Sequence, residues 1–212
     1  LRENAAVFKV NDIKFVVDQL KNLNINSNIL NGKLDLSQIV IIGHSLGGNA
    51  AFEFCSSDNR CKAAINFDGA LWSEVGRMGL KKPGMIIAGE HPEFSMPCIT
   101  MVNSHAYLND EWCEAERSLV ISRWKKILET GQDSYFIQIK GAKHANFADV
   151  QFVILLSNSP FKTVIGSISP KHMWRITCDY ILAFLNKYIH NISLNFPSVL
   201  SKKYQKIVLE TI

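Results

Sequence analysis

The chain has 212 residues, of which 47% are hydrophobic and 20% are charged. This composition predicts one folded globular domain and excludes an intrinsically disordered chain. The net charge of +4 is small, and the basic residues are spread along the sequence, which argues against a nucleic-acid-binding protein. The apolar segment at residues 150–156 is too short to span a membrane.

The first half of the chain alternates between helical and strand patterns. Apolar residues at helical spacing predict an amphipathic helix over residues 11–22. An uninterrupted, largely β-branched run at 38–42 predicts a strand buried on both faces of a parallel sheet. A helix is expected over about 46–55, and two more buried strands over 62–67 and 84–89. The expected apolar face of the first helix comprises Ile13, Val16, Val17 and Leu20.

The second half contains one interval that is long for a connection between strands. A fourth strand is predicted over 134–140, so residues 90–133 separate it from the third. This stretch holds a helix that should stop near Gly131, and it is interpreted either as an ordinary crossover helix after a long loop or as a lid formed by 90–112. A last helix is predicted from an apolar stripe of Trp174, Cys178, Ile181, Leu182, Leu185 and Ile189.

This order of elements predicts an α/β fold with a mostly parallel sheet flanked by helices on both faces. At the end of its first strand lies the sequence "GHSLGG", with Ser45 between Gly43 and Gly47. A sharp strand-to-helix turn exposes a serine and aims the first helical N–H groups at developing negative charge, and it leaves room only for very small residues two positions before and after. The pattern therefore predicts that Ser45 is a nucleophile on such an elbow, with Leu46 N–H as an oxyanion donor.

A nucleophilic serine needs a base, and in this kind of fold the order along the chain is serine, acid, histidine. His144 is the favoured base because it follows the fourth strand, and loops at the carboxyl ends of parallel strands build the sites of open α/β sheets. Two acids are candidates to orient it, Asp68 after the second strand and Glu90 after the third. Position alone does not decide between them.

The chain resembles the α/β-hydrolase family of plasma-type platelet-activating factor acetylhydrolases and bacterial dienelactone-hydrolase-like esterases. The matching segments, found in family order over about residues 11–152, are "DIKFVVDQL", "LDLSQIVIIGHSLGGNAAF", "RCKAAINFDGALW", "KPGMIIAGE" and "IKGAKHANFADVQF". The resemblance implies that Asp68 is the acid, Ser45 the nucleophile and His144 the base. It also implies that residues 1–212 form a partial domain that lacks the N-terminal strands of the fold and the loop that supplies a second oxyanion donor.

The function implied by the resemblance is hydrolysis of short-chain acyl esters of phospholipids through an acyl-enzyme. A general lipase, a dienelactone-hydrolase-like enzyme, a peptidase and an inactive, truncated binding domain remain alternatives. No cofactor or metal site is predicted, because the histidine and carboxylate spacings fit no ligand pattern. The expected partner is a small ester or phospholipid and not a nucleic acid.

Three further features are left open by the sequence. The segment "FVILLSNSPF" (152–161) is interpreted mainly as core, with peripheral contact to a lipid surface as the alternative. The five cysteines favour free thiols, although a Cys55–Cys61 bridge across a short loop is possible, and for that reason the compartment is undetermined. The oligomeric state is also undetermined.

Overall fold

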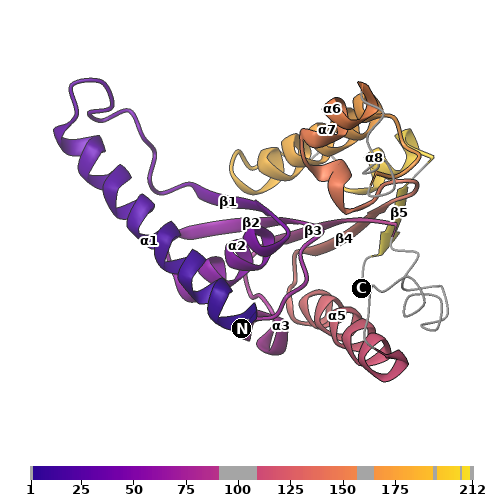
Figure 1. Ribbon diagram of the computed structural model, residues 1–212. Helices are drawn as coiled ribbons and strands as arrows, with labels where there is room; N and C mark the ends of the chain where they lie inside the picture. Colours follow the sequence, from indigo (N-terminus) through magenta and orange to yellow (C-terminus); the bar gives the residue numbers. More distant parts are fainter. Residues whose placement is uncertain (1, 91–108, 157–164, 193–194, 206, 211–212) are drawn as a thin grey trace.

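A computed structural model shows a five-stranded sheet with the strand order β1-β2-β3-β4-β5 (Figure 1). The first four strands are parallel, and β5 pairs antiparallel with β4. The strands are β1 (Ile39–His44), β2 (Cys61–Phe67), β3 (Gly84–Gly89), β4 (Ser134–Ile139) and β5 (Ile207–Glu210). The structure describes residues 2–90, 109–156, 165–192, 195–205 and 207–210.

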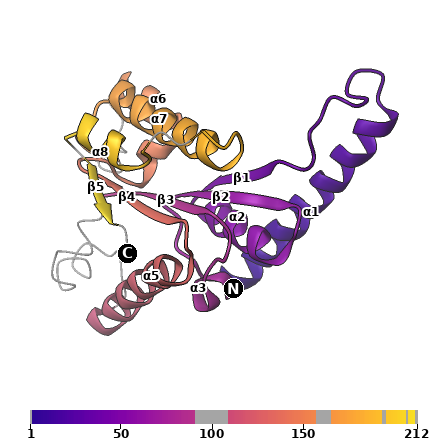
Figure 2. The ribbon, with the colours of Figure 1, turned by 180° about the vertical axis from the view of Figure 1, so that it is seen from behind.

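Helices cover both faces of this sheet, as the alternating pattern predicted. One face carries α2 (Leu46–Ser57), α3 (Glu74–Met78) and α5 (Asp110–Thr130), with α1 (Arg2–Asn26) packed against α2. The opposite face carries α6 (Val150–Leu156), α7 (Pro170–Tyr188) and α8 (Ser198–Lys203). Figure 2 shows the same two layers from behind. A 3₁₀ turn, η2 (His144–Phe147), follows β4.

Each face of the sheet has its own apolar core. On the side of α2 and α5, alternate strand residues such as Ala64 and Ile86 pack against Phe54 and Trp124. The intervening strand residues pack on the other side, against Tyr180, Phe184 and their neighbours in α7 and α8. The central strands are therefore buried on both faces, which explains why their sequences are continuous apolar runs.

The predicted elements are present, with differences at their ends. The first helix extends well beyond the predicted 11–22, and β1 runs two residues past the predicted end at 42. The short β5 was not predicted, because four residues without a clear pattern give little signal. The helix expected in the long interval is α5, and Gly131 is its C-cap. The alternative of a lid at 90–112 concerns mainly residues 91–108, which lie outside the described residues.

The helix predicted near the end of the chain is present as α7, but most of its packing against the sheet comes from a different apolar stripe. The residues that face the core are Met173, Ile176, Tyr180 and Phe184, whereas Trp174 and Leu182 of the predicted stripe are 61% and 59% exposed. Both stripes are apolar and lie side by side on the helix, so periodicity alone could not choose between them. The stripe that packs against the sheet contains the aromatic residues Tyr180 and Phe184.

The segment at 152–161 also departs from its interpretation as core. Phe152 and Val153 of α6 are 42% and 65% exposed. The side chains of 154–161 lie outside the described residues. The described part of this segment is therefore surface. No described helix is both long and apolar enough to cross a bilayer.

The free-thiol interpretation was wrong for Cys113, which is disulfide-bonded, and for Cys55 and Cys61, which form a disulfide with each other. The bridge joins the last turn of α2 to the first residue of β2. Cys178 in α7 is a free thiol.

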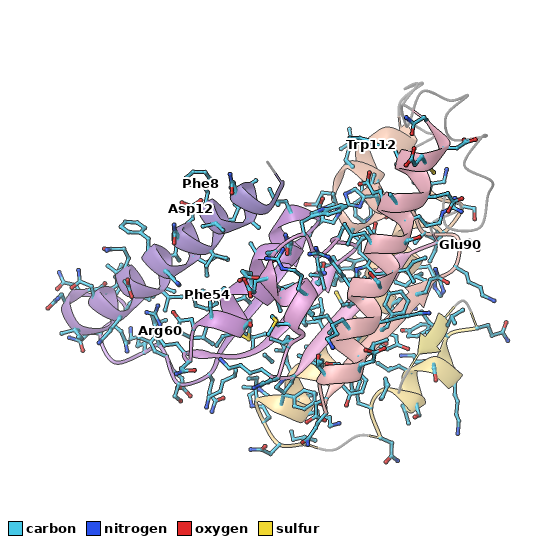
Figure 3. The ribbon with its side chains drawn as sticks, turned by 90° about the horizontal axis from the view of Figure 1, so that it is seen from below. Phe8, Asp12, Phe54, Arg60, Glu90 and Trp112 are labelled. Atoms are coloured by element: carbon cyan, nitrogen blue, oxygen red, sulfur yellow. A yellow bond between two sulfur atoms is a disulfide. The ribbon has the colours of Figure 1, made fainter. Side chains whose placement is uncertain are left out.

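An apolar groove runs along β1, one of the two edge strands of the described sheet. The groove has a volume of about 460 Å³ and lies between one side of α1 and the strand, reaching Gly43 and Gly47 at the elbow. Ile42 in β1 is 43% exposed. Figure 3 labels Phe8 and Asp12 on α1; Phe8 is 71% exposed, and Asp12 is one of the residues that line the groove.

Candidate active site

Ser45 occupies the turn between β1 and α2. Its φ of 58° and ψ of −123° are unusual for a residue with a side chain, as expected of a strained elbow. The turn is held by the Ser45 N–H, which donates to Phe67 O at 2.8 Å, and by the Ser45 carbonyl, which accepts from Gly48 N–H at 3.0 Å. Leu46 is the first residue of α2, so its N–H has no acceptor within the helix and can face a ligand.

The glycines of the elbow are needed to different degrees. A Cβ on Gly43 would lie 2.1 Å from Gly47 O, and one on Gly48 would lie 2.0 Å from the side-chain oxygen of Asn66. A Cβ on Gly47 would meet nothing within 4 Å. The expectation that both Gly43 and Gly47 require very small residues was therefore correct for Gly43 and wrong for Gly47. The crowding arises from the backbone of Gly47, while its own Cβ position is open.

Asp68 follows β2 and also has an unusual backbone, with φ of 55°. Its carboxylate is fully buried, and Oδ2 lies 2.7 Å from His144 Nδ1. Its other oxygen accepts from Gly89 N–H at 2.8 Å. Because an ionised carboxylate only accepts, the proton of the shared hydrogen bond is on Nδ1, and neutral His144 presents a lone pair on Nε2. This is the arrangement by which an acid orients a base.

Asn66 fixes the turn that carries Asp68. Its side chain is fully buried, accepts from Gly69 N–H and donates to Gly69 O, each at 2.8 Å. Trp124 of α5 donates through Nε1 to the same Gly69 O at 3.2 Å. Asn66 was not predicted from the sequence. Its signal is a polar side chain within the apolar run at 62–67, which must find hydrogen-bond partners when buried.

His144 opens the η2 turn after β4, and Asn146 holds that turn in place. The buried Asn146 Oδ1 accepts from Lys143 N–H at 2.8 Å and from Gly166 N–H at 2.7 Å. The His144 side chain is 50% exposed, so a substrate can reach it. Asn146 was also missed, because its contact with Gly166 depends on how the chain returns to this turn.

The competing acid, Glu90, lies at the end of β3 (Figure 3). Its Oε2 accepts from Gly141 N–H at 2.8 Å. It also lines a cavity of about 330 Å³ together with Gly141 and Lys143. The carboxylate bonded to His144 is therefore that of Asp68.

His44, next to Ser45, contacts the same histidine. Its Nε2 lies 3.1 Å from the carbonyl oxygen of His144, and the two rings are 4.5 Å apart between centroids. Burial is the main cause that lowers the pKa of His44, and the charge of protonated His144 lowers it further. His44 therefore stays neutral more readily than an exposed histidine. This contact was not predicted from the sequence.

The described residues contain no group of three or more His, Cys, Asp or Glu side chains placed to hold a metal ion. Ser45, Asp68 and His144 follow β1, β2 and β4 at the carboxyl edge of the sheet, where Asp68 contacts His144. In chemical terms this set offers a hydroxyl on a strained turn, an oriented imidazole and a helix N-terminus.

A solved structure shares the fold of this chain. A ferulic acid esterase from Streptomyces cinnamoneus superposes with a TM-score of 0.73 over 99% of this chain and 56% of its own, at 20% sequence identity. A model of the family described as platelet-activating factor acetylhydrolase, isoform II, matches residues 6–198. The chain belongs to this family.

Curated relatives carry corresponding names. A platelet-activating factor acetylhydrolase from Cavia porcellus is 26% identical over 88% of this chain and 36% of its own length. A probable 1-alkyl-2-acetylglycerophosphocholine esterase from Arthroderma benhamiae is 30% identical over 77% of this chain and 39% of its own. The chain thus spans little more than a third of the length of these relatives.

Proposed function

We propose that the protein containing this chain is a serine esterase that hydrolyses short-chain acyl esters of phospholipids. The observation that carries the proposal is the 2.7 Å hydrogen bond between buried Asp68 and His144, at the same edge of the sheet as the strained Ser45 elbow. The substrate class is supported by membership of the acetylhydrolase family and by the names of the relatives.

In the proposed reaction, Ser45 Oγ attacks the ester carbonyl carbon while His144 Nε2 takes the hydroxyl proton. Leu46 N–H stabilises the oxyanion of the tetrahedral intermediate. The intermediate collapses to an acyl-Ser45, and the alcohol leaves with the proton from His144. Water then attacks the acyl group while His144 takes a proton from the water. His144 returns this proton to Ser45 Oγ as the acid is released. Asp68 holds the tautomer and stabilises the imidazolium.

The test uses an organophosphonate probe and a panel of esters on the intact protein. The probe should attach to Ser45, and Ser45→Ala should abolish both labelling and turnover, a loss on the order of 10⁶-fold. Labelling that persists in Ser45→Ala would refute the nucleophile. Ester substrates of increasing acyl length, with a matched amide, test the substrate class. A preference for long-chain triacylglycerols or for the amide would contradict the proposal of short-chain acyl esters.

A further inference from the structure

The side chain of His44 lies between the two rings of the η2 turn. Its ring centroid is 4.5 Å from that of His144 and 6.1 Å from that of Phe147, the first and last residues of the turn. Phe147 stacks in turn on Phe67, the last residue of β2, at 5.7 Å. The ring of His44 thus packs against both ends of the short turn that carries the base.

A hydrogen bond between His44 and His144 accompanies this packing. A carbonyl oxygen can only accept, so His44 Nε2 carries a proton and donates it to His144 O at 3.1 Å. That carbonyl lies on the backbone of His144 itself. The donor therefore restrains the backbone of the base, while Asp68 restrains its ring through Nδ1.

We propose that His44 is a positioning residue, whose Nε2–H and ring hold His144 in register with Ser45. This inference rests on the proposed function, in which His144 is the base. His44 immediately precedes Ser45 in the chain, so it links the position of the nucleophile to that of the base across 100 residues of sequence. Its half-buried ring packs against protein rings, which favours a supporting role over contact with substrate.

Two substitutions separate the hydrogen bond from the ring. His44→Phe keeps an aromatic ring but removes the donor, whereas His44→Gln keeps an N–H donor at a similar reach. Because small misplacements of reacting groups cost up to about 10²-fold, His44→Phe should lower kcat by about 10- to 100-fold with little change in KM. His44→Gln should recover most of this loss. The matched control is His190→Phe, which removes an exposed imidazole after α7 and should leave kcat unchanged.

The kinetic result has clear contrary outcomes. A His44→Phe variant that turns over like the wild type would overturn the proposal. So would a His44→Gln variant as impaired as His44→Phe, because the donor would then not be the feature that matters. Melting temperatures of all three variants identify any loss of activity that arises from unfolding. For a variant that loses stability, the nitrogen-15 spectra described next test whether His44 positions His144.

A spectroscopic measurement tests the proposal without turnover. In nitrogen-15 spectra of the histidine rings, His144 should give sharp signals and a slowly exchanging Nδ1 proton in the wild type and in His44→Gln. In His44→Phe its signals should broaden and that proton should exchange faster. Unchanged His144 signals in His44→Phe would overturn the positioning role. A wild type that fails to label at Ser45 would instead refute the proposed function, so the two failures are distinguishable.

Discussion

At the carboxyl ends of its parallel strands the sheet carries Ser45, Asp68 and His144, whereas at the amino ends it carries covalent and ionic cross-links. The residues at the carboxyl edge include two with positive φ, Ser45 and Asp68. Such conformations cost of order 1–3 kcal/mol each and persist only where the surroundings enforce them. This edge is held by hydrogen bonds between backbone groups and the buried side chains of Asn66 and Asn146.

The amino edge is fastened differently. The Cys55–Cys61 disulfide ties α2 to β2, and Arg60 pairs there with Asp58 at 2.7 Å and with Asp18 of α1. The hydrogen bond from Arg60 is the main cause that lowers the pKa of Asp58 to about 2. The comparison shows that the strained backbone of Ser45 and Asp68 lies at one end of the α2–β2 unit. The disulfide and the ion pairs of Arg60 lie at the other end. Substitutions at the two edges should therefore have different kinds of effect.

The largest effect is expected at the acid. Asp68→Asn should preserve the fold but hold the wrong tautomer of His144, so turnover should fall by a factor on the order of 10⁴. Glu90→Gln is the matched control and should cost far less, because Glu90 binds Gly141 N–H. Steady-state kinetics on a small ester, with a melting curve for each variant, measure this. If Glu90→Gln has the larger effect, Asp68 is not the acid.

A smaller effect at the same edge distinguishes the two elbow glycines. Gly43→Ala places a methyl group 2.1 Å from the backbone oxygen of Gly47, so the elbow must shift, with a loss of turnover on the order of 10²-fold. Gly47→Ala should remain active, because its Cβ position is open and alanine favours a helix over glycine. Equal losses in the two variants would contradict the geometry of the turn.

The smallest effect on activity is expected at the amino edge. The disulfide closes a short loop, so replacing Cys55 and Cys61 together with serine should lower the free energy of unfolding by about 2 kcal/mol. That corresponds to a melting temperature lower by roughly 4–8 °C. Turnover at a temperature where both proteins are folded should not change. A large loss of turnover in the folded double variant would show that the two edges are coupled.

Much of this molecule could be predicted from its sequence because the elements and the elbow are local patterns. Three features can be recognised without tertiary information: the apolar strand segments, the glycines around Ser45, and the order of Ser45, Asp68 and His144. The choice between Asp68 and Glu90 was not, since both end parallel strands, and only the family resemblance separated them.

The remaining features depend on the packing of distant segments. The contact of His44 with His144 joins residues 100 positions apart, and no local pattern encodes it. The open Cβ position of Gly47 depends on how α1 lies along β1, and the buried face of α7 depends on which apolar stripe the sheet accepts. The interpretation of the cysteines failed for a related reason, because a bridge requires the end of α2 to lie beside the start of β2.

The strand order also has a consequence for the timing of folding during synthesis. Strands β1 to β4 lie side by side in the order in which they leave the ribosome, so each new strand finds its partner already made. Ser45 and Asp68 can thus reach their places while much of the chain is still being synthesised. His144 is synthesised only after β4. The hydrogen bond between Asp68 and His144 therefore forms after β1 to β4 have been synthesised.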